Sequence, residues 1–229
     1  HTFDEMELSS GGTIRPAKQV YNLYLKLLRD KKYPVMIGGE HTISLGAVMA
    51  CQKFYPDLSV VYLDGFANLL DNYQGNKYAR LTVGRRIAEI CPVYIFGVKS
   101  LARAEHEFSK GNDRVKIHLA REGRLSEISS ERIEEISNFI YLTIDVSVFD
   151  PYFLPAMSNP EPGGASWDEF FIFMRRLFGR KTVVGFDVVE AVSNSGNPGP
   201  DLILAKIIYR LIAFQVVATS SSMREKYFS

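Results

Sequence analysis

The chain alternates short apolar runs, rich in β-branched residues, with longer segments whose apolar residues recur at helical spacing. This alternation constrains the fold most, because continuous apolar strands separated by helices indicate a parallel sheet covered on both faces. The expected strands are residues 34–37, 60–63, 93–96, 115–117, 140–144 and 182–186. The expected helices are residues 16–29, 43–54, 79–90, 103–110, 130–137, 166–178 and 200–217. We therefore predict an α/β fold, a three-layer α/β/α domain with a mostly parallel sheet.

Length and composition bound the domain organisation. The chain has 229 residues, of which 46% are hydrophobic and 23% are charged, as in an ordinary globular protein. A chain of this length buries enough surface to fold without disulfides or a structural metal. We find no internal repeat, low-complexity linker or shift in composition, so we predict one domain over residues 1–229. The tail after Ala218 is expected to be a frayed end or a short helix.

Charge, apolar runs and cysteines narrow the class of protein. The formal net charge is +1, and no segment concentrates the Lys and Arg residues that nucleic-acid binding requires. We expect no membrane partner, because we find no apolar run of membrane-spanning length and the first residues, 1–3, show no signal pattern. Cys51 and Cys91 lack CxxC spacing, which favours buried free thiols in a reducing compartment. We therefore predict a cytoplasmic protein.

Polar residues follow three of the expected strands directly. In an open parallel sheet a ligand site lies at the carboxyl ends of the strands, so these residues are candidates. Gly38 and Gly39 permit a sharp turn before His41, although a lone histidine is more often structural and no phosphate-loop motif is present. Asp64 also follows a strand, but an Asp at that place is commonly a helix cap or a loop anchor. Asp145 ends an entirely apolar strand, where a carboxylate is costly without a neighbouring cation or donor.

Seven segments, taken together and in order, resemble the ureohydrolase family, which includes arginase, agmatinase and formimidoglutamase. The matching segments are residues 38–42, the turn at Asp64, and residues 73–78, 141–145, 149–151, 160–167 and 184–190. The resemblance runs from about Tyr24 to Ala213 and is nearest to the prokaryotic agmatinase-like branch. Family members usually begin with a further strand and helix, so we expect the chain to lack an N-terminal piece.

The resemblance implies a two-metal hydrolase, in which a pair of Mn²⁺ ions share a bridging hydroxide that attacks a guanidinium carbon. The family's ligands lie in a GGxH segment, a DxHxD triplet and a DxD pair. Matched position by position, His41, Asp64 and Asp145 are metal ligands, and Asn68 stands where the triplet ends in Asp.

The chain departs from this ligand set at three positions. Phe66 replaces the triplet's histidine, Ser147 replaces the second Asp of the pair, and the Asn68 amide is a weak ligand. Asp64 and Asp145 supply two negative charges, which one divalent ion balances and two would exceed. The resemblance therefore implies one Mn²⁺ ion at most, or none, with the Phe66 ring filling vacated space.

Two further residues are candidates for catalysis. The resemblance matches Glu161 to a glutamate that binds the guanidinium group, and Arg80 to a histidine thought to relay protons. Because buried carboxylates need a counter-cation, we predict that Arg80 pairs with Asp64, Asp145 or Glu161, within about 4 Å. The alternative is an arginine that points to solvent from the start of its helix.

We expect an arginase/agmatinase-family protein whose hydrolysis of guanidino compounds is impaired, acting as a homo-oligomer or as a hetero-oligomer with an active paralogue. Two alternatives stay open. One is a mono-metal or metal-independent enzyme that uses Asp64, Asp145, Glu161 and Arg80 on another substrate. The other is a protein that binds a small guanidino, amine or carboxylate ligand without turnover.

Overall fold

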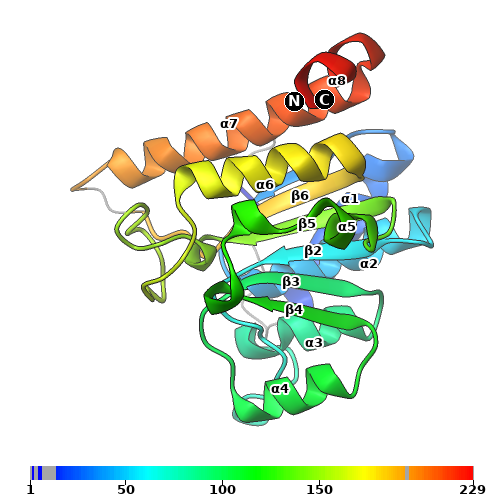
Figure 1. Cartoon of the computed structure of the whole chain (residues 1–229). Coiled ribbons are helices and arrows are strands. Elements are labelled where there is room, and N and C mark those ends of the chain that lie inside the picture. Colours follow the sequence, from blue (N-terminus) through cyan, green and yellow to red (C-terminus); the bar gives the residue numbers. More distant parts are fainter. Residues whose placement is uncertain (1, 3–4, 7–13, 194–195, 229) are drawn as a thin grey trace.

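The computed structural model describes residues 2, 5–6, 14–193 and 196–228, and its centre is a six-stranded sheet (Figure 1). The strands are β1 (Val35–Ile37), β2 (Ser59–Leu63), β3 (Val93–Val98), β4 (Val115–Leu119), β5 (Phe139–Asp145) and β6 (Thr182–Val189). Their spatial order is β1-β6-β5-β2-β3-β4, and every neighbouring pair is parallel. The predicted sheet is confirmed, and all of its strands are parallel.

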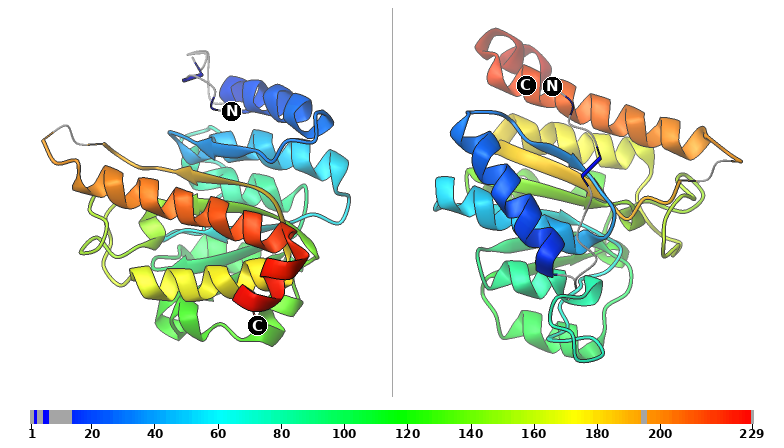
Figure 2. Two further views of the ribbon diagram at one scale, coloured as in Figure 1. Left: turned by 90° about the horizontal axis from the view of Figure 1, so that it is seen from above. Right: turned by 180° about the vertical axis from the view of Figure 1, so that it is seen from behind.

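Helices cover both faces of this sheet, which confirms the three-layer prediction (Figure 2). The helices are α1 (Ile14–Arg29), α2 (Ser44–Phe54), α3 (Val83–Ala88), α4 (Arg103–Lys110), α5 (Ser130–Glu134), α6 (Trp167–Arg180), α7 (Gly199–Thr219) and α8 (Ser221–Phe228). Apolar side chains of α1, α2 and α3 form the core on one face, and those of α5, α6 and α7 form the core on the other. In β2, Val61 and Leu63 face the second core while Val60 and Tyr62 face the first, because successive side chains of a strand point to opposite faces.

Single 3-10 turns, η1 to η5, interrupt the connections between these elements. They are η1 (His41–Ile43), η2 (Arg80–Thr82), η3 (Ala120–Glu122), η4 (Leu125–Glu127) and η5 (Val146–Val148). The single helix predicted for residues 79–90 is therefore wrong, since η2 precedes a shorter α3. The Thr82 hydroxyl bonds to the backbone of Ala79 and Lys77, which competes with a continuous helix at this point. The tail beyond residue 220 forms the short helix α8 rather than a frayed end.

Helix α7 corrects the expectation that no apolar run reaches membrane-spanning length. It has 21 residues and is apolar enough, by length and composition alone, to cross a membrane. Lys206 and Arg210 interrupt the apolar run, so the sequence shows no uninterrupted apolar stretch of this length. Leu204, Ile207 and Leu211 are buried against the domain, whereas most of the helix is not.

The carboxyl ends of four neighbouring strands meet at one edge of the sheet. The strand register places Ile144 of β5 opposite both Leu63 of β2 and Val188 of β6, and Val188 opposite Ile37 of β1. The residues that follow these four strands therefore lie close together in space.

Candidate functional site

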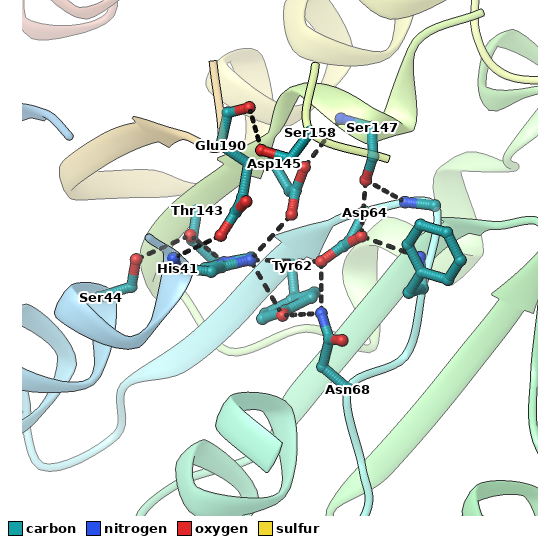
Figure 3. Close-up of polar contacts among 12 residues, drawn as sticks. His41, Ser44, Tyr62, Asp64, Asn68, Thr143, Asp145, Ser147, Ser158 and Glu190 are labelled. Atoms are coloured by element: carbon teal, nitrogen blue, oxygen red, sulfur yellow. Dashed lines mark hydrogen bonds and ion pairs between the residues drawn. The ribbon is translucent and has the colours of Figure 1, made fainter. Parts of the chain in front are cut away.

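His41, Asp64 and Asp145 converge at this edge (Figure 3). The imidazole Nδ1 of His41 lies 3.2 Å from Oδ2 of Asp64 and 3.3 Å from Oδ2 of Asp145, and all three side chains are fully buried. One potential ligand atom from each residue lies within 4.8 Å of the other two. The His41 ring also stacks on Tyr62, with 4.6 Å between ring centroids, which limits its rotation. The predicted convergence of these three side chains is confirmed.

The remaining oxygens of the two aspartates bind donors of the protein itself. Oδ1 of Asp64 accepts hydrogen bonds from the backbone N of Phe66 and the hydroxyl of Ser147, each over 2.8 Å. Oδ1 of Asp145 accepts the backbone N–H of Ser147 over 2.8 Å. The amide of Asn68 donates to Oδ2 of Asp64 over 2.8 Å, while its buried Oδ1 has no hydrogen-bond partner within the described ranges.

The charges of the cluster are strongly interdependent. Burial alone would lower the pKa of His41, but its hydrogen bonds to Asp145 and Asp64 and their negative charges outweigh this and raise the pKa to about 10. Burial and the charge of Asp145 raise the pKa of Asp64 to about 6, against the opposing effect of His41. A proton on Nδ1 and a divalent cation would thus compete for the same place between the two carboxylates.

Three of these residues could together hold a divalent cation. His41, Asp64 and Asp145 offer an imidazole nitrogen and two carboxylate oxygens, a donor set that suits Mn²⁺. On the other side of Asp64, Phe66 has no side-chain ligand atom, and the Ser147 hydroxyl is already bonded to Oδ1 of Asp64 and to the Gly65 backbone N. A second cation on this side would have to displace these hydrogen bonds, and neither Phe66 nor Ser147 would offer it a charged ligand.

Lys99 is a neighbour of this site that the sequence analysis missed. Its Nζ donates to the carbonyl oxygens of Phe149, over 3.3 Å, and Glu161. The side chain of Lys99 passes close to Gly65 and Ser147. A Cβ added at Gly65 would lie 2.7 Å from Lys99 Cε and 2.7 Å from the Ser147 carbonyl oxygen, so the lysine side chain lies on the Ser147 side of the cluster. Burial lowers the pKa of Lys99, against the negative charges around it, which include Asp64 and Asp145. Lys99 directly follows the apolar strand β3, and a charged residue at this place in the sequence indicates a candidate site residue.

The predicted ion pair of Arg80 is wrong. Among the described residues, Arg80 forms no ion pair with Asp64, Asp145 or Glu161, and each of these carboxylates has other partners. It begins η2, and its charge lowers the pKa of Glu40 against the burial that raises it. The assignment of Arg80 to catalysis stays a prediction.

Glu190 is a glutamate beside the cluster to which the sequence analysis gave no role. Oε1 of Glu161 accepts the Ser100 hydroxyl over 2.5 Å, and its assignment to guanidinium binding stays a prediction. Glu190 directly follows β6, is buried, and accepts the backbone N–H of His41 at Oε1 over 2.9 Å (Figure 3). Its φ of 63° is unusual for a residue with a side chain, and such strain is typical of functional sites. The sequence analysis missed it, although a carboxylate after an apolar strand was again the signal.

Comparison with known proteins gives a consistent set of matches. A family model described as "Arginase family" matches residues 2–213. The N(1)-aminopropylagmatine ureohydrolase of Synechocystis sp. is 32% identical over 191 residues, which are 82% of this chain and 62% of that protein. The agmatinase of Halalkalibacterium halodurans is 29% identical over 190 residues, covering 81% of this chain and 65% of that protein. The chain thus spans a little under two thirds of the length of these two relatives.

A solved structure has a similar fold. The agmatine ureohydrolase of Thermoplasma volcanium superposes with a TM-score of 0.79 at 29% identity, covering 92% of this chain and 71% of that one.

Proposed function

Since the chain belongs to the arginase family, we propose that it is an agmatinase-like protein that holds a single divalent cation, binds a small guanidino or amine ligand, and is impaired in ureohydrolysis. The family resemblance inferred from the sequence is confirmed, whereas the cation number, the ligand and the loss of activity are our proposals.

The single-cation proposal depends mainly on one observation. The hydroxyl of Ser147 donates to Asp64 at the oxygen that faces away from His41, and the neighbouring Phe66 offers only a ring. A cation held by His41, Asp64 and Asp145 would act as a Lewis acid and lower the pKa of a bound water. The family's shared hydroxide needs two cations, so we expect the urea-forming reaction to be slowed by orders of magnitude.

Glu190 supports a cationic ligand. Its carboxylate is buried beside the cluster, and its hydrogen bond to the His41 backbone holds it in place. A guanidinium or ammonium group can donate hydrogen bonds to a carboxylate in this setting, and a guanidinium can do so through two parallel bonds. Glu161, which the sequence suggested for this role, is bonded to Ser100 instead.

A second candidate function is a single-cation hydrolase acting on a different substrate. The proximity of three potential ligand atoms, all within 4.8 Å of one another, favours it, because one cation with an open position can activate water. Urea release would not detect such an activity, whereas cation-dependent hydrolysis of other amidine or amide compounds would.

Ligand binding and activity can be tested on the same preparations. We expect calorimetry with agmatine in the presence of Mn²⁺ to detect binding, and urea assays with agmatine and arginine to detect no turnover. Glu190→Gln should weaken agmatine binding at least tenfold, whereas Glu161→Gln, the matched control, should leave it within about twofold. Urea release that disappears with a chelator would contradict the proposal of impaired activity. Equal losses in the two variants would contradict the role of Glu190.

A further inference from the structure

A chain of buried polar groups leads from His41 into the core of the domain. Nε2 of His41 lies 2.9 Å from the Thr143 hydroxyl, which lies 2.5 Å from Oδ1 of Asp187. The Tyr141 hydroxyl donates to Oδ2 of Asp187 over 2.8 Å and lies 3.2 Å from the Tyr24 hydroxyl. Thr143 and Asp187 are neighbours because β5 and β6 pair in this register.

Asp187 is the group in this chain that needs an explanation. It has no exposed surface, and no ion pair of Asp187 occurs in the described part of the protein. Burial raises the pKa of Asp187, and the charge of His41 and the hydroxyls that donate to it oppose this rise. Burying a carboxylate costs free energy, and filling this position in the core does not require a carboxylate.

The hydrogen bonds of the chain have a forced direction. The hydroxyls of Thr143 and Tyr141 donate to the two oxygens of Asp187. Thr143 has one hydroxyl hydrogen, and its contact with Asp187 is shorter than its 3.3 Å contact with Ser44. Toward His41 the Thr143 oxygen therefore acts as an acceptor, and Nε2 carries a hydrogen whether or not Nδ1 does.

We propose that Asp187 is a positioning residue: through Thr143 it keeps the hydrogen of His41 on Nε2 and so leaves Nδ1 as the nitrogen that faces Asp64 and Asp145. This inference rests on the proposed single-cation site, because an Nδ1 that faces the two carboxylates is useful when it can bind a cation. A hydrogen-bond partner that sets the ring orientation and basicity of a metal-binding histidine typically changes metal affinity 10- to 100-fold.

The test uses four variants and two measurements on the whole chain. Asp187→Leu removes the acceptor and Thr143→Val removes the connecting hydroxyl. Thr143→Ser keeps that hydroxyl, and Tyr141→Phe removes only the other donor to Asp187. The first measurement is nitrogen-15 NMR of labelled histidines, which is tractable because the chain has four. The second is calorimetric titration with Zn²⁺, a diamagnetic probe.

In the wild-type protein we expect a slowly exchanging Nε2–H signal from His41 and, with Zn²⁺, an Nδ1 shift typical of a metal-bound nitrogen. Asp187→Leu and Thr143→Val should lose the protected Nε2–H signal and bind Zn²⁺ 10- to 100-fold more weakly. Thr143→Ser and Tyr141→Phe should keep both properties, within about threefold in affinity. Thermal unfolding verifies that each variant is folded.

An Asp187→Leu variant that keeps the protected Nε2–H signal and wild-type Zn²⁺ affinity would overturn the inference. If Asp187→Leu does not fold, the test depends on Thr143→Val and Thr143→Ser. An equal Nε2–H signal and an equal Zn²⁺ affinity in these two variants would overturn the inference. If the wild-type chain binds no Zn²⁺ or Mn²⁺, the proposed single-cation site fails. The Nε2–H signal then still decides whether Asp187 orients His41.

Discussion

The Ser147 hydroxyl donates to Oδ1 of Asp64 over 2.8 Å, while Oδ2 of the same carboxylate lies 3.2 Å from Nδ1 of His41. The two oxygens of one aspartate thus have different partners: Oδ1 accepts from the Ser147 hydroxyl and the Phe66 backbone, and Oδ2 lies between the His41 imidazole and the Asn68 amide (Figure 3). A carboxylate that bridges two cations through its two oxygens needs both of them free. This arrangement is the structural basis for proposing one cation and not two.

Restoring acidic and imidazole ligands on both sides of Asp64 should create a second cation position. We expect the triple variant Phe66→His, Asn68→Asp and Ser147→Asp to bind one more Mn²⁺ ion per chain than the wild type, because it supplies one imidazole and two carboxylates. The single variant Phe66→His is the control and should bind no additional ion. Elemental analysis after desalting measures both. A triple variant that is folded and has the wild-type Mn²⁺ content would show that the missing ligands are not the limiting feature.

Removing the charge of Lys99 should strengthen cation binding. Its ammonium lies among the acidic residues of the site and repels a cation held there, so Lys99→Gln should raise Mn²⁺ affinity about tenfold, equivalent to about 1.4 kcal/mol. Lys116→Gln makes the same change of charge at an exposed position of β4 and should leave the affinity unaltered. Calorimetry compares the two variants. An equal effect of both would mean that only the overall charge matters.

Both cysteines should be unreactive in the folded protein. Burial raises the pKa of Cys51 and of Cys91 to about 12, which means that the neutral thiol is favoured and that only about one in ten thousand is ionised at pH 8. A disulfide reagent at pH 8 should therefore label neither thiol until denaturant unfolds the chain, when both react. Rapid labelling of the native protein would contradict the buried positions of these thiols.

The loop that carries Glu161 should be intolerant of a side chain at Gly164. A Cβ there would lie 2.4 Å from the carbonyl carbon of Phe149 and 2.6 Å from the backbone N of Asp150, neither of which can move without shifting the adjacent backbone. We expect Gly164→Ala to lower the free energy of unfolding by about 2–3 kcal/mol. Gly39→Ala is the matched control, since a Cβ at Gly39 meets no atom within 4 Å. Denaturant titration compares the two, and an equal stability would refute the close approach.

The fold and three site residues were predictable from the sequence because they depend on local patterns. Uninterrupted apolar strands between helices required a covered parallel sheet, and His41, Asp64 and Asp145 each lie at or just beyond a strand end on the same edge. Glu190 and Lys99 carry the same signal, at the ends of β6 and β3. The resemblance assigned the binding and catalytic roles to other positions, Glu161 and Arg80, and gave no role to these two residues.

The error on Arg80 has a different cause. Its predicted partner depended on the direction of a long side chain from the η2 turn, and sequence spacing does not determine that direction. The buried network around Asp187 was unpredictable for a related reason. It depends on the register between β5 and β6, which sets Thr143 opposite Asp187.

The most direct test of the account is the number of Mn²⁺ ions that the chain binds at saturation. Titration calorimetry with elemental analysis of the same sample should give a plateau of one ion per chain. Asp145→Asn should abolish this binding, because it removes one of the two carboxylates that face His41. A plateau of two tightly bound Mn²⁺ ions per wild-type chain would contradict the account, as would a complete absence of binding.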